Sequence, residues 1–209
     1  MHRGAALPDA PRDDTLVFAH LTDPHLTSLD GIPAPLRDKR LFGWLSWRRR
    51  RRHRHLPAIL ARIVADIDAE GIEQRVVTGD LTQIGLPSEL EAARSWLERL
   101  GGGDRVTLVP GNHDLYVADR DRAMHEHWAP WMCSDDGSRG FPFLRLRGPV
   151  AFIGLDSAAP SPPLLATGRL GRRQREALRD LLQRTAAAGY ARVVLIQRPC
   201  PAAIPGASG

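Results

Sequence analysis

Cysteine is scarce in this 209-residue chain, and long hydrophobic runs are missing from it. The two cysteines, Cys133 and Cys200, lie far apart and form no CxxC pattern, which excludes a disulfide scaffold and a cysteine-based zinc site. A membrane-spanning helix needs about 18 consecutive apolar residues, and no run approaches that length. Residues 1–15 contain no apolar segment of the kind found in secretory signals, so we expect a cytoplasmic protein.

The overall composition is that of an ordinary folded protein. Hydrophobic residues make up 43% of the chain and charged residues 25%, and these values argue against wholesale disorder. The net charge of +5 is modest, but the six arginines between positions 48 and 54 supply more than all of it. The basic character of the chain is therefore a local feature.

The hydrophobic pattern predicts strands that alternate with helices. Short apolar runs, each followed by a polar turn, are typical of strands buried on both faces, and they span residues 16–21, 75–78, 105–109, 150–155 and 192–196. Apolar residues at helical spacing predict helices over residues 56–67, 88–100 and 170–182. This alternation indicates βαβ units and an α/β fold with a mainly parallel sheet, in which ligands bind at the carboxyl ends of the strands.

One domain accounts for most of this pattern. We expect residues 1–14 to be a flexible N-terminus, residues 15–199 to form the domain, and residues 200–209 to be an unstructured tail. Two segments of the domain lack regular periodicity. We interpret residues 30–55 as a basic insertion and residues 118–143 as an irregular excursion over the surface.

Three of the polar turns carry side chains that can bind metal ions. They are DPH at residues 23–25, GD at 79–80 and GNHD at 111–114, and each directly follows a predicted strand. Each motif alone is an ordinary turn sequence. Three of them in order, all at the carboxyl ends of strands, are far less expected by accident. The combination, rather than any single motif, therefore indicates a metal site.

The residue types in these turns suit a particular kind of metal site. Asp23 and His25 can converge on one cation, because the proline between them restrains the backbone. Asp80 can bridge two cations through its two oxygens, and Asn112 offers a neutral carbonyl oxygen. Nitrogen and oxygen ligation without sulfur suits Mn²⁺, Fe or Zn²⁺. His113 would stand beside the site without needing to be a ligand.

The ordered set of motifs, in the contexts LTDPHL and VVTGDLTQ, resembles the calcineurin-like metallophosphoesterase family and its bacterial cyclic-nucleotide-phosphodiesterase-like branch. The resemblance runs from about Leu16 to Ile196. It implies a sandwich of two mixed sheets flanked by helices, with residues 15–199 as a partial metallophosphoesterase domain. It also implies a hydrolase that cleaves phosphate esters, and in this branch phosphodiesters, by attack of a metal-bridging hydroxide on phosphorus.

The same resemblance implies roles for individual residues. Asp23 and His25 would hold the first of two divalent ions (Mn, Fe or Zn), Asp80 would bridge both ions, and Asn112 would hold the second. The catalytic pair would be His113, acting on the leaving group or the phosphoryl oxygens, and Asp114, orienting its ring. Proton transfer by such a side chain typically contributes about 10²–10⁴-fold to the rate.

The chain departs from the family's motifs in two places. Gln197 follows the strand at residues 192–196, where the family places a ligand histidine, and no histidine follows His127, so the Gly-His-x-His turn is missing. We therefore expect a weak second metal site and an incomplete second sheet. Truncation, a frameshift or degeneration would each explain this, and a non-catalytic remnant that binds one metal or an anionic ligand is the alternative function.

A segment rich in tryptophan and arginine predicts a surface contact. Trp44 and Trp47 precede the run Arg48, Arg49, Arg50, Arg51 and Arg52, a composition that suits an anionic membrane surface or an anionic substrate. A solvated insertion explains the segment about equally well. Nucleic acid is the weakest alternative, because no reading module accompanies the arginines. A peripheral location at the membrane and an adaptor role thus stay open, and no obligate protein partner can be inferred.

Overall fold

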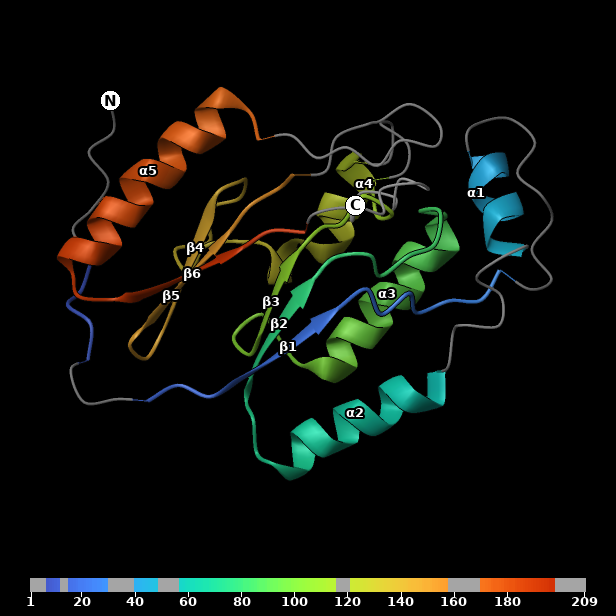
Figure 1. The fold of residues 1–209 in the computed structure, drawn as a ribbon, viewed down its shortest axis with the longest axis horizontal. Coiled ribbons are helices and arrows are strands. Elements are labelled where there is room, and N and C mark those ends of the chain that lie inside the picture. Colours follow the sequence, from blue (N-terminus) through green and yellow to red (C-terminus); the bar gives the residue numbers. More distant parts are fainter. Residues whose placement is uncertain are drawn as a thin grey trace, which may run out of the picture.

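The computed structural model of the chain describes residues 7–11, 15–29, 40–48, 57–115, 121–157 and 170–197. Within these residues the strands form two sheets of three strands each, with helices on the outer faces of both (Figure 1). The α/β class predicted from the hydrophobic pattern is therefore confirmed. Each predicted strand is also present, displaced by no more than two residues at either end.

The first sheet is parallel throughout its described strands. It contains β1 (Phe18–Thr22), β2 (Gln74–Thr78) and β3 (Val106–Val109), in that order. The register pairs the last residue of β1 with the last residue of β2, and the last residue of β2 with the last residue of β3. The polar turns that follow the three strands therefore begin side by side at one edge of the sheet.

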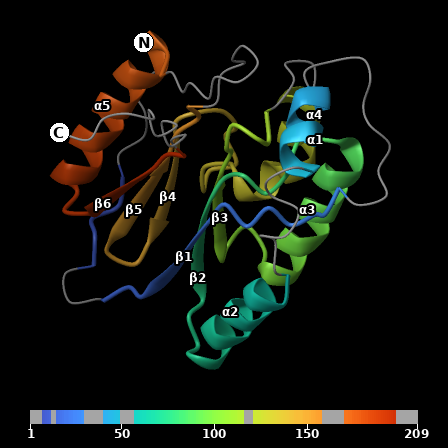
Figure 2. The same cartoon turned by 45° about the vertical axis from the view of Figure 1, so that its right-hand side comes forward.

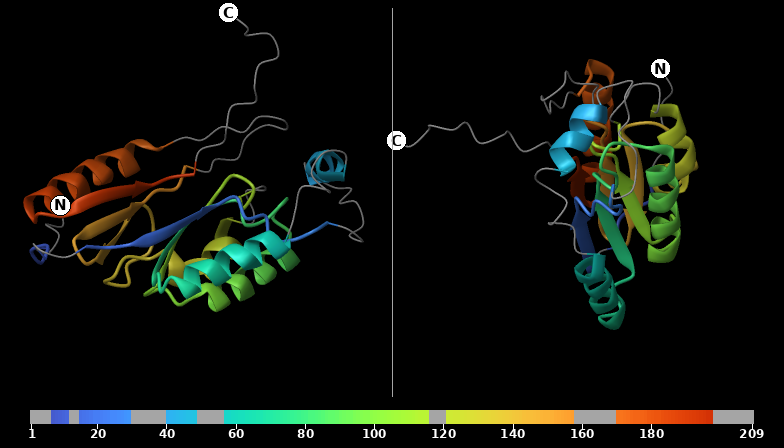
Figure 3. Two further views of the ribbon diagram at one scale, coloured as in Figure 1. Left: turned by 60° about the horizontal axis from the view of Figure 1, so that its bottom comes forward. Right: turned by 90° about the vertical axis from the view of Figure 1, so that its right-hand side faces the viewer.

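Two helices cross over between these strands. The helices α2 (Pro57–Ala69) and α3 (Pro87–Leu100) lie together on one side of the first sheet (Figure 3). The inner face of α3 is buried and apolar, with Leu90, Ala93, Leu97 and Leu100 on it. Parallel neighbours need such crossover connections, which explains why this sheet is wholly parallel rather than mixed.

The second sheet is mixed. It contains β4 (Phe143–Arg147), β5 (Val150–Gly154) and β6 (Ala191–Leu195); β4 and β5 form an antiparallel hairpin, and β6 runs parallel to β5. The crossover helix α5 (Arg172–Ala187) covers its outer face, while α2 and α3 lie outside the first sheet (Figure 2). The predicted sandwich of two sheets flanked by helices is thus confirmed.

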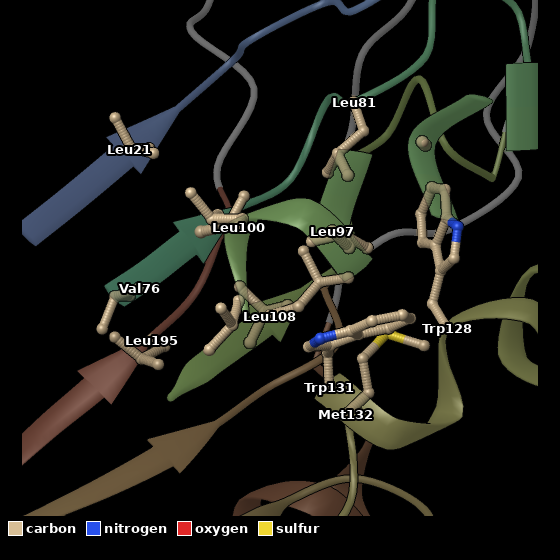
Figure 4. Close-up of a cluster of buried hydrophobic side chains, with 14 of the residues drawn as sticks. Leu21, Val76, Leu81, Leu97, Leu100, Leu108, Trp128, Trp131, Met132 and Leu195 are labelled. Atoms are coloured by element: carbon tan, nitrogen blue, oxygen red, sulfur yellow. The ribbon is translucent and has the colours of Figure 1, made fainter. Parts of the chain in front are cut away.

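The two sheets share one hydrophobic core. Phe18 of β1 and Phe152 of β5 meet edge to face, with ring centroids 5.2 Å apart. Side chains from both sheets and from the helical segment that follows β3 fill the same cluster, including Val76, Leu108, Leu195, Trp128 and Trp131 (Figure 4). This packing holds the ends of β6 and β2 close together, which matters for the site described below.

Residues 121–131 of the segment 118–143 are helical, so the prediction of an irregular excursion was wrong for this part. It contains α4 (Asp121–Trp128) and a short 3₁₀ helix (Ala129–Trp131). Two indole N–H groups anchor it to α3 and to the residue after that helix: Trp128 donates to the carbonyl of Leu90 at 3.2 Å, and Trp131 donates to the carbonyl of Gly101 at 2.8 Å. Tertiary packing on α3 stabilises a helix that is too short to be predicted from its own sequence.

The hydrophobic pattern did not predict strand β4, because this strand buries the charged side chain of Arg145. Phe143 and Arg145 both point into the interior, so the strand does not show the usual alternation of apolar and polar residues. The guanidinium of Arg145 donates to the carbonyl oxygens of Cys133 at 2.8 Å, Val106 at 2.6 Å and Pro130 at 2.7 Å. A short helix, α1 (Arg40–Ser46), also lies in the segment 30–55, which was read as an insertion.

Candidate metal centre

The polar turns after β1 and β2 are held together by backbone hydrogen bonds. The N–H of Asp23 donates to the carbonyl of Gly79 at 3.2 Å, and the N–H of His25 donates to the carbonyl of Asp80 at 3.0 Å. Asp23, His25 and Asp80 all have positive φ angles, of 52°, 41° and 56°. This left-handed conformation costs about 1–2 kcal/mol for a residue with a side chain. Three such residues in one place mark a local strain of the kind that gathers at functional sites.

These three residues form the best candidate for a metal site among the described residues. One ligand atom from each of Asp23, His25 and Asp80 can be chosen so that all three lie within 4.8 Å of one another. The ring Nδ1 of His25 lies 3.0 Å from the carbonyl oxygen of Thr82, so Nδ1 carries the proton and Nε2 the lone pair. Two carboxylates and an imidazole are a donor set that fits a divalent cation such as Mn²⁺, Fe²⁺ or Zn²⁺.

The electrostatics of the site also fit a cation. The pKa of Asp80 is raised to about 8, mainly by burial and then by the neighbouring carboxylates of Asp114 and Asp23, while the backbone N–H of His113 acts in the opposite direction. Burial likewise raises the pKa of Asp114 to about 6, although four hydrogen bonds to its carboxylate act in the opposite direction. A cation beside Asp80 would stabilise the charged carboxylate and so offset the free-energy cost of burying it.

Asp114 connects the turns that follow β2 and β3. Its Oδ2 accepts from the backbone N–H groups of Asp80 at 2.8 Å and Gly111 at 2.9 Å. Its Oδ1 accepts from the N–H of Thr82 at 3.0 Å and from the hydroxyl of Thr82 at 3.2 Å. These bonds hold the two turns against each other. That Asp114 orients the ring of His113, as the resemblance implied, stays a prediction.

His113 lies directly beside the three candidate ligands. Its ring meets the ring of His25 edge to face, with centroids 5.1 Å apart. Its Nδ1 lies 2.6 Å from the carbonyl oxygen of Gln83, and its backbone N–H donates to Oδ1 of Asp80 at 2.9 Å. The carbonyl of Gln83 therefore orients this ring. The sequence motifs do not reveal this role, because any residue type can supply a backbone carbonyl.

Two glycines allow the turns to come this close. A Cβ on Gly79 would lie 2.4 Å from the backbone nitrogen of Gly111, and a Cβ on Gly111 would lie 2.2 Å from Oδ1 of Asp80. Gly79 also has a positive φ of 66°. A side chain at either position would push the two turns apart, so GD and GNHD require glycine for steric reasons.

The remaining predicted ligand positions lie around Asp80. Asn112 is half-buried in the turn between Gly111 and His113. Gln197 follows β6 and is buried, and its side-chain N–H donates to Oδ2 of Asp80 at 3.1 Å. The hydroxyl of Ser157, which follows β5, donates to the carbonyl of Gln197. The second sheet thus supplies an amide where the family places a histidine.

The structure describes three residues of the predicted surface contact, Trp44, Trp47 and Arg48. Trp47 is 3% exposed and packs with Leu29 and Ile84, so its inclusion as a membrane-contacting residue was wrong. Arg48 is exposed and lies over the ring of Trp44, 5.2 Å from its centroid. Arg49–Arg52 lie outside the described residues, so the membrane contact stays a prediction. No helix among the described residues combines the length and the apolar character needed to cross a membrane.

Comparison with known protein families agrees with this geometry. The fold and the three turns define an α/β phosphoesterase with a candidate metal site. The family model for calcineurin-like phosphoesterases matches residues 16–186, and the chain belongs to this family. No curated protein matches the chain. Membership indicates hydrolase activity on phosphate esters, and the family resemblance inferred from the motifs is confirmed.

Proposed function

We propose that the chain is a metal-dependent phosphodiesterase of the cyclic-nucleotide-phosphodiesterase-like branch. The observation that carries this proposal is the convergence of Asp23, His25 and Asp80 at the carboxyl edge of the first sheet, with His113 beside them. The family supports phosphate-ester hydrolysis. The contexts LTDPHL and VVTGDLTQ support the phosphodiester branch.

The three candidate ligands differ in how far they are exposed to solvent. Asp23 is exposed and His25 is half-buried, whereas Asp80 is buried at the base of the site. A cation held by these three side chains would be open to substrate on the side of Asp23. When bound, a divalent cation would supply Lewis-acid stabilisation of the phosphoryl oxygens and would acidify a water molecule. Among the residues that the structure describes, a second ion would have Asp80 and Asn112 as protein ligands.

His113 is the candidate general acid. Its Nδ1–H is held by the carbonyl of Gln83, so the protonated ring would present Nε2–H as a donor. A proton from this nitrogen would neutralise the alkoxide that leaves when the P–O bond breaks. Asp114 would act only indirectly, by fixing the turn that carries His113 against the turn that carries Asp80.

Metal-dependent turnover tests this proposal. The purified chain, stripped of metal with a chelator, should hydrolyse bis(p-nitrophenyl) phosphate only after Mn²⁺ is added, and faster than p-nitrophenyl phosphate. The variant Asp80→Asn should lose at least about 100-fold in activity, because it removes a charged ligand from a buried site. The variant Asp66→Asn, at an exposed carboxylate on α2, is the matched control.

The alternative function is a non-catalytic remnant that binds one metal or an anionic ligand. The amide of Gln197 at Asp80, in place of a ligand histidine, is the observation that favours it. The same assay separates the two functions. Tight binding of Mn²⁺ without turnover of either substrate would establish the remnant, and metal-dependent turnover would exclude it.

A further inference from the structure

The contact between Gln197 and Asp80 joins the two sheets inside the site. Gln197 follows β6 of the second sheet, Asp80 follows β2 of the first, and the exposed fractions of the two residues are 6% and 4%. The amide N–H lies 3.1 Å from Oδ2 of the carboxylate. The hydroxyl of Ser157 holds the backbone carbonyl of Gln197, so the amide is supported from its own side as well.

This amide occupies a position at which a cation could bind Asp80. The two carboxylate oxygens offer about four lone-pair positions, of which Oδ1 already accepts from the N–H of His113 and Oδ2 accepts from Gln197. An N–H group turns the positive end of its dipole toward Oδ2. A cation at the same place would lose that lone pair and would be repelled by the N–H.

The other residues around Asp80 do not compensate for this loss. Among the described residues, the histidine, cysteine and carboxylate side chains close enough to share an ion are Asp23, His25 and Asp80. These three fit one cation. A second cation would depend on the neutral oxygen of Asn112 and on an oxygen of Asp80 that is already hydrogen-bonded. The residues that the structure describes therefore do not fit a second metal ion.

We propose that the centre holds one divalent cation per chain and that the amide of Gln197 takes the place of a second cation at Asp80. The proposal rests on the metal site of the proposed function. It has a consequence for the substrate, because a single cation neutralises less phosphoryl charge than two. A phosphodiester carries one negative charge and a phosphomonoester up to two, so a centre with one cation should favour diesters.

Metal stoichiometry tests the proposal directly. The full chain is loaded with Mn²⁺, desalted and measured by elemental analysis, and binding is measured by titration calorimetry. We expect one ion per chain in the unchanged protein. We expect two ions in Gln197→Glu and Gln197→His, because each replaces an N–H donor with an acceptor that can ligate. Gln183→Glu, at an exposed position on α5, is the matched control and should keep one ion.

Each outcome decides the proposal. Two ions bound with affinities within about tenfold of each other in the unchanged chain would overturn it, and so would a single ion in both folded Gln197 variants. If the variants fail to fold, the stoichiometry of the unchanged chain still decides. Two ions together with turnover would remove this inference and leave the proposed function intact. No bound ion in the unchanged chain would remove both.

Discussion

The two sheets contribute unequally to the site, although both end at the same edge. The first sheet places Asp23, His25 and Asp80 in turns that are joined by backbone hydrogen bonds and by the carboxylate of Asp114. Among the described residues that follow strands of the second sheet, Gln197 donates its amide N–H to Asp80, and Ser157 donates its hydroxyl to the carbonyl of Gln197. The carboxylates that can bind a cation therefore follow strands of the first sheet. The described residues of the second sheet contribute hydrogen bonds to the site.

The largest expected effect comes from separating the turns of the first sheet. In Gly111→Ala the new Cβ would lie 2.2 Å from Oδ1 of Asp80 and 2.4 Å from its backbone nitrogen. We expect a loss of about 1–3 kcal/mol in the free energy of unfolding and loss of detectable metal binding. Urea denaturation and calorimetry with Mn²⁺ measure both quantities.

Gly171→Ala is the matched control for this variant, because nothing lies within 4 Å of a Cβ at that position and its φ is −63°. Metal binding by Gly111→Ala at the level of the unchanged chain would show that the close approach of the two turns is not needed.

The second prediction concerns the pH dependence of the metal-free chain. Burial raises the pKa of Asp80 to about 8 and the pKa of Asp114 to about 6. Between pH 4 and pH 8 the folded chain therefore holds protons that the unfolded chain has released. The stabilising contribution of these groups is complete below about pH 4 and is lost as the pH rises through 6 to 8.

Melting temperatures in the presence of a chelator, compared between the unchanged chain and Asp80→Asn, measure this effect. The difference in melting temperature should move in favour of Asp80→Asn as the pH rises, because the amide carries no charge to bury. Added Mn²⁺ should reverse the trend, since cation binding requires the deprotonated carboxylate. A difference that does not change with pH would contradict the raised pKa of Asp80.

The smallest effect is expected from the second sheet. Ser157→Ala removes the hydroxyl that holds the carbonyl of Gln197. We expect a loss of about 1 kcal/mol in the free energy of unfolding, typical of one hydrogen bond. The affinity for Mn²⁺ should change much less than in Gly111→Ala. An equal loss of affinity in calorimetry would show that the second sheet is as important for the first cation as the turns are.

Much of the first sheet could be predicted from the sequence. Its strands are continuous apolar runs, and each ends in a turn whose residue types point to metal ligation. Strand β4 and helix α4 could not be predicted in the same way. Arg145 is buried through bonds to carbonyls of β3 and of the stretch from Pro130 to Cys133. Helix α4 and the 3₁₀ helix after it depend on indole contacts with α3 and the residue after it. Such contacts are not visible in local periodicity.

The same division holds within the site. Asp23, His25 and Asp80 were predicted to meet, because parallel strands in register bring their carboxyl ends together. The partners of Asp114 and the burial of Trp47 were not foreseen, because they depend on which backbone or side chain packs opposite each group. The motif names a residue type, whereas the packing decides its neighbours.

The sequence by itself determined the family, the order of strands and helices, and the set of side chains able to bind a cation, because local periodicity and turn chemistry encode these features. The tertiary structure alone decided which groups donate hydrogen bonds to the carboxylate of Asp80. Its bond to Gln197 joins residues 117 positions apart and forms only because the two sheets pack face to face around one core.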